Sequence, residues 1–137
     1  MPSYSNKSKQ KLSTAHDDLQ EIFNVVICNF DNTILDGHRD QARQDRAFNE
    51  GFSQVQFPNS KHNKVPSMAV DAVPYPIEWD NLNRMRFFAG RVIATGDILY
   101  SFGMITHKVR WGGDWDKDTV LKDNRFNDFP HFELYKP

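Results

Sequence analysis

The spacing of apolar residues between Leu19 and Phe30 constrains the fold more than any other feature of this sequence. Apolar side chains recur there every three or four residues, which is the period of one face of an α-helix. These residues are Leu19, Ile22, Phe23, Val26, Ile27 and Phe30. We expect a helix that begins near Leu12, with Ser13 or Thr14 as its N-cap. Its apolar face must pack on a core that the rest of the chain supplies.

The remaining pattern mixes helices and strands without a βαβ rhythm. Further helices are expected over residues 40–50 and from 80 through 99, and strands over residues 33–35, 68–73, 108–111 and 131–135. Residues 52–67 lack periodicity and are predicted to form a long loop, a kind of segment that often carries functional side chains. This order favours an α+β domain with a small, mainly antiparallel sheet.

Length and charge exclude several classes of protein. The chain has 137 residues, which fits one domain, and we expect a flexible N-terminal segment over 1–11 followed by a single domain over 12–137. Seventeen basic and eighteen acidic side chains lack the basic excess of a sequence-independent nucleic-acid binder. No apolar stretch approaches the roughly 20 residues of a membrane span, and the polar N-terminus shows no secretory signal.

The single cysteine, Cys28, excludes an intrachain disulfide and a cysteine-rich zinc site. Any bound metal must therefore use histidine, aspartate or glutamate. The candidate residues are His62, Asp71, Asp128 and His131. Two imidazoles and one carboxylate form a usual ligand set for catalytic zinc, and a spare acid beside the ion can accept a proton from water.

Spacing alone leaves this metal site open. Histidines are more often surface or core residues than ligands, and His16, His38 and His107 are expected to be structural. Asp71 falls within an apolar strand and needs a cation or a donor nearby. Arg39 or backbone N–H groups are the alternative to a metal as its partner.

Four ordered motifs resemble those of one peptidase family. Residues 60–62 (SKH) and 66–71 (PSMAVD) look like the first zinc-binding signature of the L-alanyl-D-glutamate peptidase and D-alanyl-D-alanine carboxypeptidase family. Residues 110–115 (RWGGDW) and 128–134 (DFPHFEL) look like its C-terminal signatures. Residues 37–39 (GHR), with Gln44 five positions later, are similar to its upstream arginine motif. The resemblance covers nearly the whole chain and is nearest to the compact endolysins of tailed bacteriophages.

The resemblance implies a ligand set and a catalytic base. Zinc would be held by His62, Asp71 and His131, with Asp128 as the base, although related members have a glutamate in that position. Arg39 would bind or polarise substrate oxygens, a task suited to its rigid fork of donors. The implied fold is that of hedgehog and D-Ala-D-Ala metallopeptidases, with helices packed on one side of the sheet.

Further residues are assigned on weaker grounds. Those expected to support the site or contact substrate are Ser60, Gln44 and Trp111, and for Trp111 the core is the favoured alternative. Carboxylates at Asp114, Asp116 and Asp118 occupy positions one, three and five of an oxygen-ligand calcium loop. Thr119 stands where an EF-hand loop has glycine, so a solvated acidic turn is the alternative to a Ca²⁺ site.

The predicted function is zinc-dependent hydrolysis of the L-alanyl-D-glutamate bond in the peptidoglycan stem peptide. A D-alanyl-D-alanine carboxypeptidase has the same parts and is the main alternative. A non-catalytic cell-wall-binding module with a vestigial metal site is a more remote one, because every required residue type is present. We expect a monomer that accumulates in the host bacterial cytoplasm and acts on the cell wall in the periplasm after release.

Overall fold

A computed structural model describes residues 1–120 and 127–137 of the chain. Its helices are α1 (Asn6–Leu12), α2 (Asp17–Val26), α3 (Gln41–Asn49) and α4 (Leu82–Ser101), with a short 3₁₀ helix, η1 (Lys61–Asn63). Its strands are β1 (Asn32–Asp36), β2 (Ala69–Pro74), β3 (Lys108–Trp111) and β4 (His131–Tyr135). The α+β class and the four strands predicted from the sequence are confirmed.

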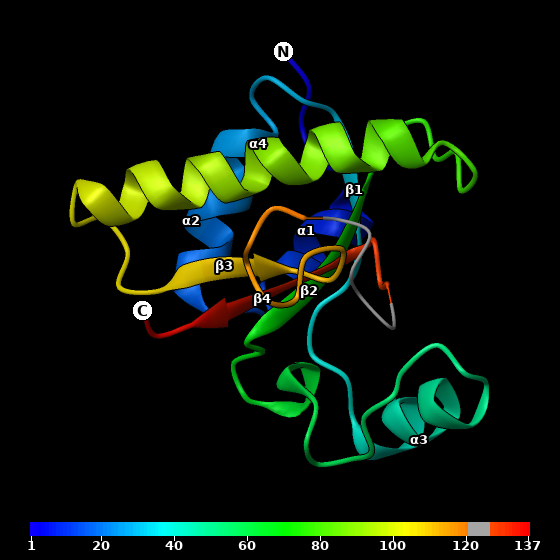
Figure 1. Ribbon diagram of the computed structural model, residues 1–137. Helices are drawn as coiled ribbons and strands as arrows, with labels where there is room; N and C mark the ends of the chain where they lie inside the picture. Colours follow the sequence, from blue (N-terminus) through cyan, green and yellow to red (C-terminus); the bar gives the residue numbers. More distant parts are fainter. Residues whose placement is uncertain (121–126) are drawn as a thin grey trace.

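The four strands form one antiparallel sheet in the order β1-β2-β4-β3. The last strand therefore lies between two strands that come earlier in the chain, as Figure 1 shows. This insertion places Asp71 of β2 directly opposite His131 of β4. It also places Arg110 of β3 directly opposite Glu133 of β4. Residues 60 positions apart in sequence thus become neighbours on the sheet.

Alternation along the strands gives the sheet one apolar face and one polar face. Val70 of β2 and Phe132 of β4 are fully buried in the hydrophobic core. Their neighbours Asp71, His131 and Glu133 point to the opposite face, because successive side chains of a strand alternate. Only the apolar face is covered by helices α2 and α4, whose buried residues belong to the same core.

Aromatic contacts join these two helices to the sheet. The Phe132 ring lies 5.7 Å from the ring of Phe23 in α2 and 5.9 Å from that of Phe88 in α4, in both cases edge to face. Such pairs stabilise a fold by about 0.5–1.5 kcal/mol beyond the area that they bury. The predicted packing of helices on one side is confirmed for α2 and α4, and the polar face stays available for a site.

The N-terminal segment differs from the sequence-based expectation. Residues 1–11 were expected to be flexible, but α1 forms there and packs beside β1. Ser8 is buried and its hydroxyl accepts the backbone N–H of Ile34, while Tyr4 donates its hydroxyl to the carbonyl of Phe23. Polar contacts therefore hold this segment, which explains why an apolar pattern did not reveal it.

Helix α2 also begins later than predicted. Ser13 and Thr14 do not cap it; His16 does, through Nδ1, which accepts the backbone N–H of Asp18 at 3.0 Å. The expected helix near Leu12 is thus two helices separated by a turn. By contrast, α3 lies within the range predicted for it, residues 40–50, and Asp40 caps it, since its side chain accepts the N–H of Arg43.

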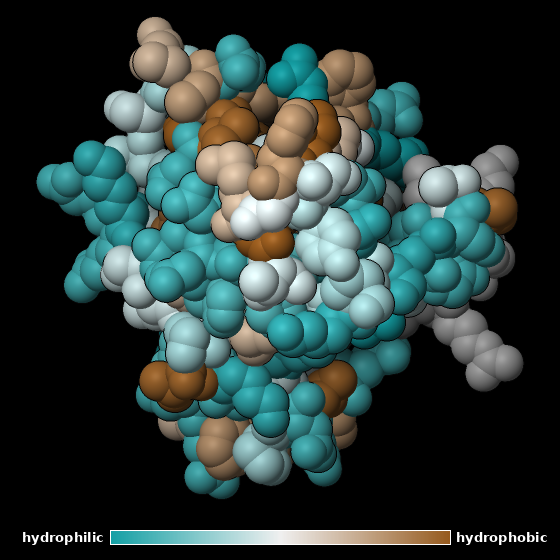
Figure 2. Space-filling view, turned by 90° about the vertical axis from the view of Figure 1, so that its left-hand side faces the viewer, coloured by the Kyte–Doolittle hydropathy of each residue, from teal (hydrophilic) through white to brown (hydrophobic). Residues whose placement is uncertain are grey.

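Helix α3 stands apart from the sheet, as Figure 1 shows. The face of the molecule at which α4 finishes carries a group of apolar side chains, in the upper half of Figure 2. The exposed apolar residues of that part of the chain are Ile98, Tyr100, Phe102 and Met104. None of the helices in residues 1–120 and 127–137 has the length and apolar character needed to cross a membrane.

Candidate metal centre

Three candidate ligands converge on the polar face of the sheet. His62 belongs to η1, which Ser60 caps by accepting the His62 N–H, while Asp71 and His131 face each other on β2 and β4. Nε2 of His62 lies 3.2 Å from Oδ1 of Asp71 and 3.2 Å from Nδ1 of His131. Nδ1 of His131 lies 3.4 Å from the same Asp71 oxygen. Residues distant in sequence thus form one triangle of ligand atoms.

This triangle has the dimensions of a tetrahedral metal site. Zinc bonds of 2.0–2.1 Å to nitrogen and oxygen place neighbouring ligand atoms of a tetrahedron roughly 3.3 Å apart. The three separations of 3.2, 3.2 and 3.4 Å agree with that spacing. A ligand set of two imidazoles and one carboxylate also suits zinc chemically. The residues present therefore fit a divalent metal ion with a fourth position for water or substrate.

Hydrogen bonds on the outer side of each ring direct the correct nitrogen inward. Nδ1 of His62 lies 2.7 Å from the carbonyl oxygen of Gly37, so it carries the proton and leaves Nε2 with a lone pair. Nε2 of His131 lies 2.8 Å from Oε1 of Glu133, which leaves Nδ1 for the triangle. These hydrogen bonds orient both rings so that Nε2 of His62 and Nδ1 of His131 face the position of the metal.

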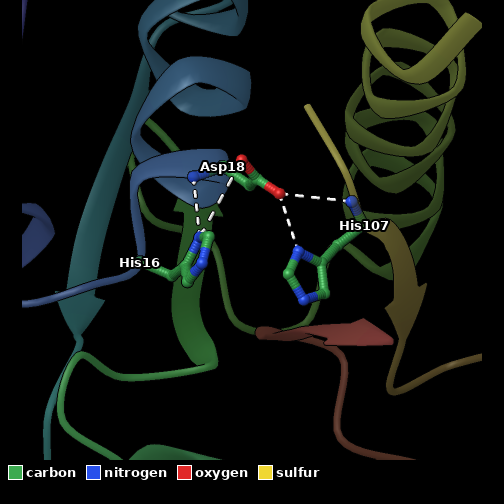
Figure 3. A group of neighbouring side chains, drawn as sticks. All are labelled: His16, Asp18 and His107. Carbon is green, nitrogen blue, oxygen red and sulfur yellow. Dashed lines mark hydrogen bonds and ion pairs between the residues drawn. The ribbon is translucent and has the colours of Figure 1, made fainter. Parts of the chain in front are cut away.

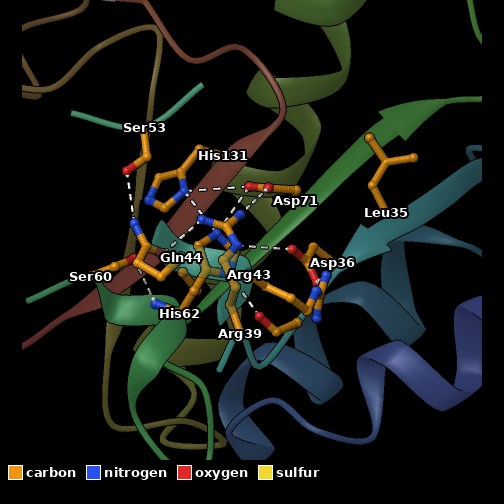
Figure 4. A network of polar contacts seen from close by, with 12 residues as sticks. Leu35, Asp36, Arg39, Arg43, Gln44, Ser53, Ser60, His62, Asp71 and His131 are labelled. Atoms are coloured by element: carbon orange, nitrogen blue, oxygen red, sulfur yellow. Dashed lines mark hydrogen bonds and ion pairs between the residues drawn. The ribbon is translucent and has the colours of Figure 1, made fainter. Parts of the chain in front are cut away.

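Asp71 is held by a network around Arg39 (Figure 4). The Arg39 guanidinium donates from Nη2 to Oδ2 of Asp71 at 3.2 Å, from Nε to Asp36 at 3.1 Å and from Nη1 to Gln44 at 2.9 Å. Gln44 is fully buried and donates in turn to the carbonyl of Val55. Arg39 therefore fixes one oxygen of Asp71 and leaves Oδ1 to face the two histidines.

The charges around the triangle favour a cation. Burial alone would raise the pKa of Asp71, but His62 and His131 hold it well below its usual range. Burial alone would lower the pKa of His131, yet its hydrogen bonds to Asp71 and Glu133 raise it to about 9. The lowered pKa of Asp71 reports the positive charge of the two imidazoles, and the raised pKa of His131 reports the negative charge of the carboxylates beside it. The same carboxylates would stabilise a divalent ion between the ligand atoms.

Asp128 lies on the wall of the same cavity. Burial and repulsion from Asp71 raise the pKa of Asp128 to about 6. Its backbone is fixed by Gly112, which donates to the carbonyl of His131 and accepts the N–H of Asp128. A Cβ atom at position 112 would lie 2.1 Å from the carbonyl oxygen of Asp128, so only glycine permits this approach. The turn after β3 thus brings the candidate base to the metal ligands.

The ligands open into a cavity of about 910 Å³, large enough for several residues of a peptide. Its lining combines Arg39, Arg110 and the metal-site residues with exposed aromatic side chains, Phe52 and Trp79. The ring of Trp115 lies 5.5 Å from that of His131. A cavity lined by both charged and aromatic side chains can bind a charged, hydrophilic chain.

The predicted supporting residues differ in position. Ser60 lines the cavity and caps η1, and Gln44 supports Arg39 by accepting a hydrogen bond from its Nη1. Trp111 does not line this cavity: it is buried in the core and donates its indole N–H to the carbonyl of Phe129 at 2.7 Å. Trp111 pairs with Phe132 of β4 and points, like Phe132, to the apolar face of the sheet. This agrees with the core position that was the favoured alternative for Trp111.

Sequence reasoning missed Glu133. It is buried on the polar face, two positions after His131, and contacts that ring directly. The available signal was the period of two along β4, which places residues 131 and 133 on the same face.

Two further groups of side chains have ligand character. Asp114, Asp116 and Asp118 offer oxygens within 4.8 Å of one another, and Oδ1 of Asp114 is buried without a hydrogen-bond partner in the described part of the chain. The second group consists of His16, Asp18 and His107 (Figure 3).

The histidine group of Figure 3 is explained by hydrogen bonds. Oδ2 of Asp18 accepts from the backbone N–H groups of Thr106 and His107, and from Nδ1 of His107 at 2.7 Å. Nδ1 of His16 already accepts the N–H that begins α2. These atoms join α2 to the start of β3, in agreement with the structural role expected for His16 and His107.

Comparison with known proteins gives consistent results. A family model described as phage L-alanyl-D-glutamate peptidase matches residues 2–135. Among solved structures, the L-Ala D-Glu endopeptidase ChiX of Serratia marcescens matches with a TM-score of 0.70 and 26% sequence identity, over 96% of this chain and 89% of that chain. No curated protein matches the chain.

Proposed function

Because the chain belongs to the phage L-alanyl-D-glutamate peptidase family, we propose that it hydrolyses the bond between L-alanine and D-glutamate in the peptidoglycan stem peptide. We propose further that it does so with a zinc ion held by His62, Asp71 and His131. The observation that carries this proposal is the triangle of ligand atoms, with sides of 3.2, 3.2 and 3.4 Å. The likeness to the endopeptidase ChiX supports the choice of bond.

The metal would supply the electrophile. Zinc held by two imidazoles and a carboxylate lowers the pKa of a coordinated water to about 7 and polarises a carbonyl group. The chain contributes the ligands, their tautomers and the walls of the cavity.

Asp128 is the proposed general base. Its carboxylate would accept a proton from the attacking water and donate it to the nitrogen of the leaving D-glutamate. A pKa raised to about 6 by burial and by Asp71 suits a group that must both take and give a proton near neutral pH. Arg39, which lines the cavity, would add positive charge near the carbonyl or carboxylate oxygens of the substrate.

Product analysis tests the bond assignment. Purified sacculi digested by the protein should release peptides with a new N-terminal D-glutamate, which mass spectrometry identifies. Loss of terminal D-alanine alone would contradict the proposal and support a D-alanyl-D-alanine carboxypeptidase. Absence of any product would instead support a non-catalytic wall-binding module. His62→Ala is the control, since it removes one ligand and should give no product.

We also propose that Asp114, Asp116 and Asp118 bind calcium. Burial, followed by the carboxylates of Asp116 and Asp118, raises the pKa of Asp114, and a cation would relieve this repulsion. The unpartnered Oδ1 of Asp114 is the observation that favours an ion over a solvated turn.

Luminescence of terbium, a calcium substitute, tests this second site, because Trp115 stands between the acidic residues and can sensitise the emission. Emission that calcium displaces, and that Asp116→Asn weakens, would support the proposal. No sensitised emission from the wild-type protein would contradict it.

A further inference from the structure

Glu133 occupies an unusual position for a carboxylate. Its relative exposure is 6%, and it lies on the polar face of the sheet, between His131 on its own strand and Arg110 on β3. A buried carboxylate is costly unless other groups neutralise it and hydrogen-bond to it. The contacts of Glu133 therefore indicate what the residue does.

The two carboxylate oxygens have different partners. Oε1 accepts the Nε2 proton of His131 at 2.8 Å. Oε2 accepts a hydrogen bond from Nη2 of Arg110 at 2.5 Å and pairs with Nζ of Lys61 at 3.5 Å. Lys61 also donates to the backbone carbonyl of Leu134. One oxygen thus serves the histidine ring and the other is neutralised by two cations.

These contacts reach two of the three metal ligands. His131 is held directly, whereas Lys61 directly precedes His62 in η1, so its ion pair ties the turn that carries His62 to β4. The partners of Glu133 come from three separate elements: η1, β3 and β4. Among the described residues, no other carboxylate forms ion pairs with both His131 and Lys61.

We propose that Glu133 is a positioning residue for the metal centre, and this inference rests on the proposed zinc site. By accepting the Nε2 proton, its carboxylate fixes the ring so that Nδ1 faces the ion, and it makes that nitrogen a stronger donor. Arg110 and Lys61 neutralise the carboxylate, so that it supports the ligand without competing for the metal. Glu133 thereby raises zinc affinity without contacting the ion.

Zinc affinity of the purified full-length protein tests this role. Competition with a chromophoric chelator measures the dissociation constant for wild type, Glu133→Ala and Glu133→Gln. We expect Glu133→Ala to weaken zinc binding about 10–100-fold. Glu133→Gln should weaken zinc binding less than Glu133→Ala does, because its amide oxygen can still accept the His131 proton. Asp97→Asn is the matched control: it removes an exposed carboxylate that pairs with Lys108 at 3.7 Å, and should bind zinc like wild type.

Cobalt substitution adds a readout of ligand geometry. The visible absorption of the Co²⁺ protein should change in Glu133→Ala and stay near that of wild type in Asp97→Asn. Because Glu133→Ala could fail to fold, Glu133→Gln, which keeps the side-chain volume, decides in that case. Wild-type zinc affinity and cobalt absorption in both Glu133 variants would overturn the inference. Failure of the wild-type protein to bind zinc would overturn the proposed metal site itself.

Discussion

At the scale of single residues, the candidate base Asp128 and the three metal ligands have different tasks: the ligands bind the ion, and Asp128 transfers a proton. Asp128 lines the cavity, and its backbone N–H donates to Gly112 while its backbone carbonyl accepts from His131. Its position therefore depends on the backbone, whereas its proposed chemistry depends on one carboxylate. A change confined to that carboxylate should separate catalysis from binding.

Asp128→Asn is such a change. It preserves the size of the side chain and both backbone hydrogen bonds but removes proton acceptance, so kcat should fall by about 10²–10⁴-fold. Zinc affinity should stay close to that of wild type, because Asp128 is not among the three ligands. Hydrolysis of sacculi and chelator competition measure the two quantities. A variant that retains wild-type hydrolysis would remove Asp128 from the mechanism.

Gly112→Ala tests the turn that positions Asp128. The new Cβ would lie 2.1 Å from the Asp128 carbonyl oxygen, so the backbone must move, at a cost of about 1–3 kcal/mol in unfolding free energy. Activity should fall with stability. Gly90→Ala is the matched control in α4: no atom lies within 4 Å of its new Cβ, and stability should rise by about 0.5–1 kcal/mol. Denaturant unfolding measures the unfolding free energy of both variants. Equal changes in Gly112→Ala and Gly90→Ala would contradict the steric argument.

At the scale of elements, Asp18 links the first turn of α2 to the segment that enters β3. Burial alone would raise the pKa of Asp18, but hydrogen bonds from His107 and Thr106 lower it overall. A carboxylate with a lowered pKa in the folded state stabilises the protein at pH values above its unfolded pKa of about 3.9. This stabilisation is lost as the pH falls through the folded pKa.

Asp18→Asn should therefore destabilise the protein by about 1.5–3 kcal/mol at neutral pH, the usual contribution of hydrogen bonds to a charged group. The difference from wild type should narrow as the pH falls from about 4 toward 2. Denaturant unfolding at several pH values measures it. Asp17→Asn, which changes an exposed carboxylate in the same turn, should show a smaller difference. If the difference in unfolding free energy between wild type and Asp18→Asn stays constant down to pH 2, the ionised Asp18 carboxylate does not provide this stabilisation.

The elements also show what the sequence could and could not predict. Strands and helices with apolar periodicity, such as β2 and α4, appear where predicted because burial sets their pattern. Helix α1 and the His16 cap depend on polar contacts with distant residues, including the N–H of Ile34, and no local pattern encodes those. Asp71 was identifiable because a carboxylate in an apolar strand needs a partner. Its anchoring by Arg39 was only one of several alternatives before the strands were paired.

At the scale of the whole molecule, the sheet separates stability from chemistry. Helices α2 and α4 bury the apolar face, so the polar face can carry charged side chains whose burial would otherwise be unfavourable. The insertion of β4 between β2 and β3 brings one ligand from the end of the chain next to one from its middle. A metal ion at this place would connect η1, β2 and β4, and should stabilise their arrangement as well as support hydrolysis.

Metal removal tests that connection. An ion that binds only the folded protein stabilises it by RT ln(1 + [L]/Kd), about 4 kcal/mol at a thousandfold excess over Kd. Treatment with a chelator should therefore lower Tm by on the order of 10 °C and abolish hydrolysis, and added zinc should restore both. His62→Ala should show neither the loss nor the recovery, because one corner of the ligand triangle is missing. If the chelator removes activity but leaves Tm unchanged, the ion does not bridge the three elements, and the metal must lie elsewhere on the chain.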